Sequence, residues 1–546
     1  MIAEGLADAG VKWAFTVPGE SFLGVLDALP HVGIEVVATR HEGGAAFMAE
    51  AVGQLTGKPA AVLGTRAVGA GNMAIGIHTA RQNSTPMVAL VGQVQRPFLG
   101  REAFQEVDLV KTTGGLAKWA AQIDDPGGAS RIVGEGLTEM LSGRPGPVLF
   151  ALPEDVLDEQ ITALPGSPAK AVVEPRRPAA PDPHAVRAVL DLLTRARRPA
   201  ILAGQGVLAA GARSALVALS ERLDVPVLAA WRRPTAFPAD HPHFLGTTGY
   251  GSPPTVRRRL EEADALLVIG CRLNEVASFD YTIPAAGTRW AHVDLEPRRA
   301  GAGLSPPDLA IATDCAAFLD AALAASDGYR APRERGAELR ADRQAFVAAS
   351  ALDAIPEWRG PGVHPARVVA TLNEVLPANT ILTTDAGNFG LWPARFLRLG
   401  QDMSFLGPTS GAMGYGLPAA IAASLCQPKR PVVALCGDGG LAMTMNELET
   451  AVRMRTRLVV IVFDNKRYGT IAMHQKNEQR DQIATDLGGI DFAAVARACG
   501  AQGGRVTRDR ELAPALRDAL AADRPAVVQL ELDPRWVTPD RFDDAG

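Results

Sequence analysis

The sequence has few cysteines, no long apolar run and no excess of basic residues. Only five of its 546 residues are cysteine, and their spacing is unlike that of metal ligands, which favours buried thiols in a reduced, cytoplasmic compartment. No run of about 18 apolar residues occurs, so we expect no membrane span. The net charge of −5 excludes the basic surface typical of nucleic-acid-binding proteins. The composition therefore favours a soluble protein without nucleic-acid or membrane partners.

The length of the chain favours several domains rather than one. With 546 residues, of which 47% are hydrophobic, the chain has enough apolar material for about three domains. The first fifteen residues are acidic and helical in pattern, so a secretion leader, which begins basic and continues apolar, is not expected. The run Arg257–Arg259, followed by Glu261 and Glu262, is typical of a solvated helix face.

Short apolar runs alternate with helical patterns in three parts of the chain, as in parallel α/β sheets. The sequence therefore predicts three doubly wound α/β domains over residues 1–160, 186–325 and 360–546. The predicted strands are 13–17, 34–39, 60–64, 87–92 and 148–152 in the first domain, 199–204, 225–230, 265–270 and 290–294 in the second, and 380–384, 431–436, 458–463 and 525–532 in the third.

Two segments between these domains have the composition of connections. Residues 155–185 contain the proline-rich stretches 164–168 and 175–183, which predict an extended linker. Residues 326–360 are charged, and the helical pattern from Glu334 to Arg343 predicts a linker helix.

The most informative stretch of the chain runs from Val432 to Thr470. A buried-strand pattern ends at Gly437-Asp438-Gly439-Gly440, a helical pattern follows, and a second apolar run ends at Asp464-Asn465. Open parallel sheets bind ligands at the carboxyl ends of their strands. Glycines at a helix start leave N–H groups open to phosphate, and the oxygens of Asp438 and Asn465 suit Mg²⁺. By itself, however, Gly-Asp-Gly-Gly also fits an ordinary strand-to-helix turn with a capping Asp.

The two strand ends together resemble the GDG…N motif of thiamine-diphosphate (ThDP) enzymes. In that family the Asp, the Asn and a carbonyl two residues beyond the Asn hold Mg²⁺ against the diphosphate. The resemblance implies that Asp438, Asn465 and the carbonyl of Arg467 are the metal ligands here. It extends over nearly the whole chain and implies an N-terminal pyrimidine-binding domain, a central Rossmann-like domain and a C-terminal diphosphate-binding domain.

Glu42 lies in a segment, Arg40-His41-Glu42-Gly43-Gly44, that resembles the catalytic glutamate segment of these enzymes. A lone Glu at a helix start is otherwise most often a surface residue favoured by the helix dipole. In the family, the carboxylate bonds N1′ of the aminopyrimidine and promotes loss of the C2 proton of the thiazolium. The resemblance therefore implies that Glu42 is catalytic.

The stretch Ala103-Phe104-Gln105-Glu106-Val107-Asp108 matches the acetolactate-synthase-like branch of the family. In that branch the Gln faces the reacting centre, which implies that Gln105 is catalytic and that Phe104 lines the substrate pocket. The alternative is that Gln105 is only a polar loop residue. The preceding segment, residues 64–72, departs from the family's Gly-rich TSGPGATN loop at Arg66 and Ala67.

Other cofactor contacts follow from two further segments. The turn Asp385–Phe389 corresponds to a diphosphate contact, and Thr409–Pro418 is close to the family's GxMGxGLPAAIGA stretch. The resemblance implies that the Gly411 carbonyl accepts from the 4′-amino group and that Met413 bends the cofactor, although Met413 is equally suited to core packing. The implied cofactor-binding residues are Gly387, Asn388, Gly411, Met413, Gly437, Asp438, Gly439, Gly440, Asn465, Tyr468 and Gly469.

The central domain carries a weaker nucleotide signal. Gly204-Gln205-Gly206 resembles a nucleotide-binding turn, but a lone GxG is more often structural. Relatives bind FAD or ADP in this domain, or nothing. Because Tyr250 stands where flavin-containing acetolactate synthases carry a His, bound FAD is not favoured.

The resemblance implies a ThDP- and Mg²⁺-dependent carboligase or decarboxylase acting on a 2-oxo acid such as pyruvate. Acetolactate synthases have a Trp in the acceptor pocket where this chain has His474, and Thr470 lies in the same segment. Two alternatives stay open: a lyase that cleaves a 2-hydroxyketone or a 2-hydroxyacyl-CoA, and a non-catalytic ThDP-binding homologue. In the family, Glu42 and Asp438 meet across a subunit interface, which implies a homodimer or a dimer of dimers (a homotetramer).

Overall fold

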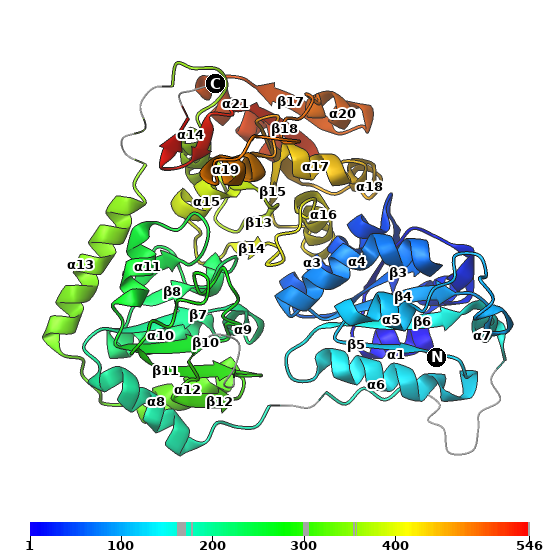
Figure 1. The fold of residues 1–546 in the computed structure, drawn as a ribbon, viewed down its shortest axis with the longest axis horizontal. Helices are drawn as coiled ribbons and strands as arrows, with labels where there is room; N and C mark the ends of the chain where they lie inside the picture. The colour runs from blue at the N-terminus through cyan, green and yellow to red at the C-terminus, as the bar shows by residue number, and fades with distance from the viewer. Residues whose placement is uncertain (161–170, 176–177, 299–304, 353–354, 356–357, 544–546) are drawn as a thin grey trace.

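The protein, described here from a computed structural model, comprises three lobes, each built on a six-stranded parallel sheet (Figure 1). The structure describes residues 1–160, 171–175, 178–298, 305–352, 355 and 358–543. Helices cover both faces of each sheet, so the predicted fold class of three doubly wound parallel-sheet domains is confirmed. No helix within these residues is long and apolar enough to cross a membrane.

The N-terminal sheet has the strand order β2-β1-β3-β4-β6-β5. Its strands are β1 (Trp13–Thr16), β2 (Glu35–Ala38), β3 (Ala60–Thr65), β4 (Met87–Gln93), β5 (Trp119–Gln122) and β6 (Pro147–Pro153). Its helices are α1 (Ile2–Asp8), α2 (Leu23–His31), α3 (Glu42–Thr56), α4 (Arg66–Asn83), α5 (Leu109–Thr112), α6 (Ala129–Leu141) and α7 (Glu154–Asp158). Helices α3 and α4 cover the face that turns toward the C-terminal domain, and α1, α2 and α6 cover the other.

The central sheet has the strand order β12-β11-β10-β7-β8-β9. Its strands are β7 (Pro199–Ala203), β8 (Val227–Ala229), β9 (Phe244–Thr247), β10 (Ala265–Ile269), β11 (Arg289–Asp294) and β12 (Leu309–Ala312). Its helices are α8 (Pro183–Arg195), α9 (Gln205–Ala209), α10 (Arg213–Leu223), α11 (Pro254–Glu261) and α12 (Cys315–Ala325). The Gly204–Gly206 turn packs directly on Gly270, where an added Cβ at Gly206 would lie 2.6 Å from the Gly270 Cα.

The C-terminal sheet has the strand order β14-β13-β15-β16-β18-β17. Its strands are β13 (Ile381–Thr384), β14 (Ser404–Leu406), β15 (Val432–Gly437), β16 (Val459–Asp464), β17 (Gln502–Val506) and β18 (Ala526–Glu531), and β19 (Trp536–Thr538) pairs separately with β20 (Arg541–Phe542). Its helices are α14 (Pro365–Val375), α15 (Leu391–Phe396), α16 (Gly416–Cys426), α17 (Asp438–Thr444), α18 (Glu447–Arg453), α19 (Gly469–Asn477), α20 (Phe492–Ala498) and α21 (Asp509–Ala521).

Every strand expected from the sequence is present, and the strands that were not expected lie at sheet edges. The three sheets have six edge strands, and of these only β2 was predicted; β5, β9, β12, β14 and β17 were not. Interior strands such as β15 and β16 are fully buried and therefore read as continuous apolar runs. Edge strands have no such signature: β17 is the half-buried sequence Gln-Gly-Gly-Arg-Val.

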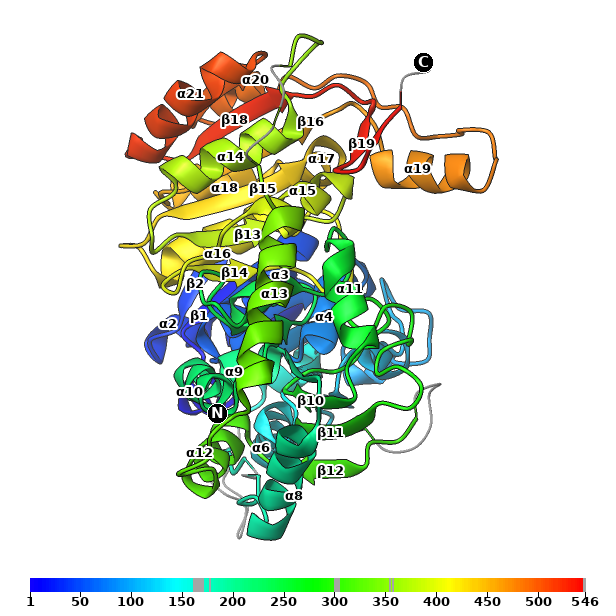
Figure 2. The same cartoon turned by 90° about the vertical axis from the view of Figure 1, so that its left-hand side faces the viewer.

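The predicted connections are partly helical. Residues Glu154–Asp158, at the start of the expected extended linker, form α7, and the stretch 164–168 lies outside the described residues. The expected linker helix is α13 (Arg333–Ala349), which runs along the central domain toward the C-terminal domain (Figure 2). Its Phe346 packs against Phe244 of β9, with ring centroids 5.9 Å apart.

The arginine run on α11 is not solvated along its whole length. The Arg259 side chain is buried, donates to the Pro199 carbonyl at 2.6 Å and pairs with Asp342 of α13 at 2.9 Å. The expectation of a solvated face is therefore wrong for this residue. A guanidinium can be buried where carbonyls and a carboxylate from other elements satisfy its donors.

A buried polar network joins the three domains. Glu50 of α3 accepts from Asn83 at 2.8 Å and from the Tyr415 hydroxyl at 2.6 Å. Asn83 in turn accepts from Arg233 of the central domain at 2.9 Å and from the Thr409 hydroxyl of the C-terminal domain at 2.7 Å. Burial and the neighbouring Glu50 carboxylate raise the pKa of Tyr415, which keeps this hydroxyl a donor.

Asn83→Ala should destabilise the protein strongly. The substitution leaves the Glu50 carboxylate and the Arg233 guanidinium buried with fewer partners, which costs about 3–5 kcal/mol. Thermal and denaturant unfolding of the two proteins would measure the difference. The control is Asn379→Ala, because Asn379 is exposed and its replacement should change the unfolding free energy by less than about 0.5 kcal/mol. Equal losses for the two variants would contradict a structural role for the network.

Candidate active site

Two neighbouring strands of the C-terminal sheet bring the predicted metal ligands together. Strand β15 ends at Gly437 and is followed by Asp438, the first residue of α17. Strand β16 pairs with β15 in parallel, with Gly437 opposite Phe463, and ends just before Asn465. Both side chains therefore lie at the carboxyl edge of the sheet, where parallel sheets bind ligands.

The Asp438 carboxyl has no basic partner among the described residues. Burial raises its pKa to about 6, and the neighbouring Asp464 carboxylate contributes in the same direction. Asp464 itself accepts from Gln529 at 2.7 Å. The strand ends therefore hold negative charge that the protein does not neutralise, which is a suitable environment for a cation.

The other two predicted ligands form a tight turn after β16. The Asn465 amide oxygen accepts from the Arg467 N–H at 3.1 Å, and the Arg467 carbonyl accepts from the Gly469 N–H at 2.9 Å. Within the described residues no three His, Cys, Asp or Glu side chains cluster as metal ligands. A cation at this turn would therefore combine one carboxylate with neutral oxygens and the oxygens of a bound phosphate, as Mg²⁺ commonly does.

Three glycines of the predicted cofactor site lie where no side chain fits. A Cβ at Gly439 would lie 2.7 Å from the Tyr468 ring, and one at Gly469 would lie 2.6 Å from Asn388. A Cβ at Gly440 would overlap the Asp385 carboxylate. The turns after β13, β15 and β16 therefore interlock, and the glycines let their backbones approach neighbouring groups closely.

Gly411 and Met413 lie in the loop between β14 and α16. Gly411 is exposed and has a φ of +70°, which favours glycine. Met413 is half-buried. The loop is fixed by a bond from the Thr444 hydroxyl to the Gly414 carbonyl at 2.9 Å, and by a contact between the Ser410 and Thr79 hydroxyls at 2.9 Å.

Asp385, in the turn expected to contact the diphosphate, is joined by Arg232, which the sequence patterns did not single out as functional. Burial raises the pKa of Asp385 to about 7, against the N–H bonds that its carboxylate accepts. The guanidinium of Arg232, which follows β8 in the central domain, donates to the Asp385 carbonyl at 2.9 Å. The sequence feature that could have identified Arg232 was its position, because Trp231-Arg232-Arg233 follows the carboxyl end of a predicted strand, where parallel sheets bind ligands.

A cavity of about 770 Å³ opens beside these residues, between the central and C-terminal domains. Of the predicted site residues, Gly387, Asn388, Gly411, Thr470 and His474 line it. None of its lining residues comes from the described residues of the N-terminal domain. One chain therefore brings together the predicted diphosphate, metal and part of the substrate residues, but not Glu42, Phe104 or Gln105.

Glu42 is the first residue of α3 and is largely buried. One of its carboxylate oxygens accepts from the Asn72 amide of α4 at 2.9 Å. The other makes no hydrogen bond within the described chain, and the Cβ-free Gly69 lies beside it. The carboxylate is thus fixed in orientation with one oxygen left for a ligand.

Gln105 has the features of a strained functional residue. Its φ is +61°, which non-glycine residues rarely adopt, and its buried side-chain oxygen has no partner in the described chain. Its carbonyl accepts from the Ala67 N–H at 3.2 Å. The adjacent Phe104 is 72% exposed and lies under the Arg66 guanidinium, 5.8 Å from its ring centroid. Such strain is typical of sites where function fixes the backbone.

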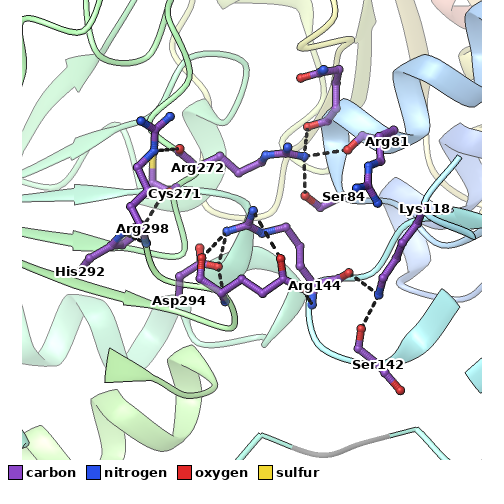
Figure 3. A network of polar contacts seen from close by, with 12 residues as sticks. Arg81, Ser84, Lys118, Ser142, Arg144, Cys271, Arg272, His292, Asp294 and Arg298 are labelled. Carbon is purple, nitrogen blue, oxygen red and sulfur yellow. Dashed lines mark hydrogen bonds and ion pairs between the residues drawn. The ribbon is translucent and has the colours of Figure 1, made fainter. Parts of the chain in front are cut away.

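A second cavity, of about 750 Å³, lies between the central and N-terminal domains and includes the Gly204–Gly206 turn. Arg144 of the N-terminal domain reaches Asp294, at the end of β11, at 2.7 Å. Arg272 donates to the Arg81 carbonyl at the end of α4 at 2.7 Å and to the Ser84 hydroxyl at 3.3 Å (Figure 3). The one acidic side chain at the end of β11 is therefore already engaged by a guanidinium.

Comparison with known families assigns each part of the chain. Residues 1–112 match the N-terminal TPP binding domain of thiamine pyrophosphate enzymes, residues 186–322 match the central domain, and residues 385–530 match the C-terminal TPP binding domain. The probable acetolactate synthase large subunit of Methanocaldococcus jannaschii is 31% identical over 98% of this chain and 92% of its own length. The chain is an acetolactate-synthase-like thiamine pyrophosphate enzyme.

Other relatives carry related names. The acetolactate synthase isozyme 2 large subunit of Escherichia coli is 29% identical over 97% of this chain and 95% of its own length. The sulfoacetaldehyde acetyltransferase of Rhodobacter capsulatus is 30% identical over 94% of this chain and 90% of its own length. The predicted ThDP-dependent family is thus confirmed, and the relatives bear more than one activity name.

Asp438→Asn should stabilise the cofactor-free protein and abolish its response to cofactor. The pKa of Asp438 rises from 3.8 to about 6 on folding, so wild-type stability falls as the pH rises through that window. Asn removes this burial cost, which should raise the unfolding free energy at neutral pH by about 1–2 kcal/mol. ThDP with Mg²⁺ should raise the melting temperature of the wild type but not of the variant.

Thermal unfolding with and without both cofactors would measure these shifts. The control is Asp486→Asn, because Asp486 is 84% exposed and pairs only with Arg467 at the surface of the same turn. This control should keep the cofactor response. An Asp438→Asn protein that is still stabilised by ThDP and Mg²⁺ would contradict the assignment.

Proposed function

We propose that this enzyme uses ThDP and Mg²⁺ to act on a 2-oxo acid such as pyruvate, as an acetolactate-synthase-like carboligase. The observation that carries the proposal is the pair of half-sites described above: a buried carboxylate with one free oxygen at Glu42, and an uncompensated carboxylate at Asp438. The first suits a bond to the cofactor's pyrimidine ring, and the second suits the cation that accompanies a diphosphate.

The C-terminal half-site would hold the diphosphate and the metal. Asp438, the Asn465 amide oxygen and the Arg467 carbonyl would bind Mg²⁺, and the backbone around Gly437, Gly439 and Gly440 would approach the phosphates. The remaining proposed cofactor contacts are Gly387, Asn388, Gly411, Met413, Tyr468 and Gly469. The interlocked turns support this assignment, because glycines at a helix start let a phosphate approach the backbone N–H groups closely.

ThDP supplies the electron sink that decarboxylation of a 2-oxo acid requires. Glu42 would hold a proton at the pyrimidine ring through its free oxygen, while Asn72 fixes its orientation. The unpartnered Gln105 oxygen belongs to an amide that can also donate to a substrate carbonyl. Phe104, Thr470 and His474 would line the pocket around the reacting carbon.

A second copy of the chain would complete the site. Along α4, Val68 and Ile75 are 50% and 42% exposed, and they flank Asn72, the partner of Glu42. Phe104 and Met443 are also exposed. Exposed apolar side chains gathered beside a catalytic candidate support an interface between copies. We therefore propose a homodimer, or a dimer of dimers, in which each site combines two chains.

Two further proposals, that FAD is not required and that the protein is cytoplasmic, rest on weaker observations. The Asp294 carboxylate is already paired with Arg144, which supports the expectation that FAD is not required. All five cysteines are free thiols, which suits a reduced compartment such as the cytoplasm.

The direct test is turnover of pyruvate by the purified enzyme with ThDP and Mg²⁺ and without added flavin. We expect acetolactate as product, and Glu42→Gln should lower kcat by about a hundredfold or more, because proton transfer loses its carboxylate. Sulfoacetaldehyde should be compared as a substrate, because one relative is named for it. Acetaldehyde alone would indicate a decarboxylase, and equal activity of wild type and Glu42→Gln would contradict the assigned role.

Complementation tests the shared site. Glu42→Gln and Asp438→Asn homodimers should each be inactive, but a heterodimer carries one site with both lesions and one intact site. An equal, fully exchanged mixture should therefore recover about a quarter of wild-type activity. A mixture of either variant with itself is the control. No recovery, with heterodimers demonstrated by mass measurement, would mean that both residues act within one chain.

A further inference from the structure

The wall of the 770 Å³ cavity is rich in arginine, contributed by the central domain, α13 and the C-terminal domain. Arg232, Arg343, Arg395 and Arg398 line the cavity, and Asp240 is the one acidic residue among its described lining residues. Two of these guanidinium groups bind other parts of the protein. Arg343 donates to the Phe244 and Ala239 carbonyls at 2.6 and 3.1 Å, and Arg395 pairs with Asp540 at 2.5 Å.

Arg232 differs because most of its donors are unused. A guanidinium carries five N–H donors, and in the described chain Arg232 uses one, to the neutral carbonyl of Asp385 at 2.9 Å. Its Nε is buried without a partner, as is that of Arg233, but Arg232 also leaves most of its Nη donors unused, and no carboxylate forms an ion pair with it in the described chain. Its backbone is held at a φ of +63°, a conformation that costs a non-glycine residue free energy. The unused Nη donors at the cavity wall suit an anionic ligand.

The neighbouring Arg233 shows what a structural arginine looks like at the same position in the fold. It is buried and donates to the Arg232 and Gly407 carbonyls and to the Asn83 amide oxygen. Arg232 instead faces the cavity, with its guanidinium 5.3 Å from the centroid of the Trp231 ring. Burial lowers the pKa of Arg232 to about 10, so the side chain stays positively charged at neutral pH.

Arg232 also lies next to the proposed reaction site. Its hydrogen-bond partner Asp385 precedes the Gly387-Asn388 turn, and Arg232 lines the same cavity as Gly411, Thr470 and His474. A bound substrate in this cavity is therefore within reach of an arginine with free donors. Arginine binds carboxylates through two parallel N–H bonds.

We propose that Arg232 is a specificity-determining residue that binds the carboxylate of a 2-oxo acid substrate in this cavity. The role of Arg232 in the reaction rests on the proposed function, whereas its binding of a carboxylate does not. An uncharged aldehyde gains nothing from the guanidinium, so Arg232 selects acids over neutral carbonyl compounds.

The test measures binding of oxamate, an unreactive analogue of a 2-oxo acid, to the enzyme loaded with ThDP and Mg²⁺, by titration calorimetry. Arg232→Met should weaken oxamate binding by about ten- to a hundredfold, the usual effect of losing a charge-assisted hydrogen bond. Arg232→Lys should be intermediate, because it keeps the charge without the paired donors. The matched control is Arg398→Met, which removes the same charge from an exposed position of the same cavity and should change binding by less than about threefold.

Kinetics and cofactor binding separate this role from a structural one. Arg232→Met should raise KM for pyruvate while KM for an aldehyde acceptor and the affinity for ThDP stay within about threefold of wild type. Unchanged oxamate binding in Arg232→Met, or no oxamate binding by the wild type, would overturn the proposal. Oxamate binding that depends on Arg232, in a protein that turns over no 2-oxo acid, would support the subsite and overturn the proposed reaction instead.

Discussion

The buried network around Asn83 is the constraint on which the arrangement of the site depends. It joins Glu50 of the N-terminal domain, Arg233 of the central domain and Tyr415 of the C-terminal domain by direct hydrogen bonds. A buried charged group without its partners costs several kcal/mol, so the three domains have one favourable mutual placement. The apolar contact of Phe47 with Tyr415 reinforces it, with ring centroids 5.4 Å apart. The cavity between the central and C-terminal domains inherits its shape from this junction.

The candidate site contains both negative and positive side chains that the protein does not neutralise by itself. At the ends of β15 and β16, the Asp438 and Asp464 carboxylates lie together without a cationic side chain. In the wall of the cavity, Arg232 holds positive charge with free donors. Such groups cost stability in the protein without ligands, and binding of the proposed cofactor and substrate would offset that cost. This distribution of charge supports the proposed binding of an anionic cofactor with its metal and of an acidic substrate.

The fixed domain placement also explains why one chain holds only part of the site. Glu42 is the first residue of α3, and Gln105 lies in a loop bonded to Ala67 at the start of α4; neither lines the cavity that includes His474. The exposed side chains of Val68 and Ile75 beside them indicate where a second copy would pack. If the proposed dimer completes the site, activity depends on assembly, which would couple catalysis to oligomerisation.

The sequence by itself determined the fold class, the interior strands and the motif residues. Continuous apolar runs and Gly-Asp-Gly-Gly are local patterns that can be read without knowing the fold. A strand buried on both faces must be apolar along its whole length, so its sequence predicts it. Edge strands such as β17 and buried arginines such as Arg259 were missed or misjudged, because their environment comes from distant segments. Three properties were decided only by the tertiary structure: the strained backbone of Gln105, the free donors of Arg232 and the separation of Glu42 from the cavity. Each depends on which groups from other elements come within hydrogen-bonding distance, and no local sequence pattern records that.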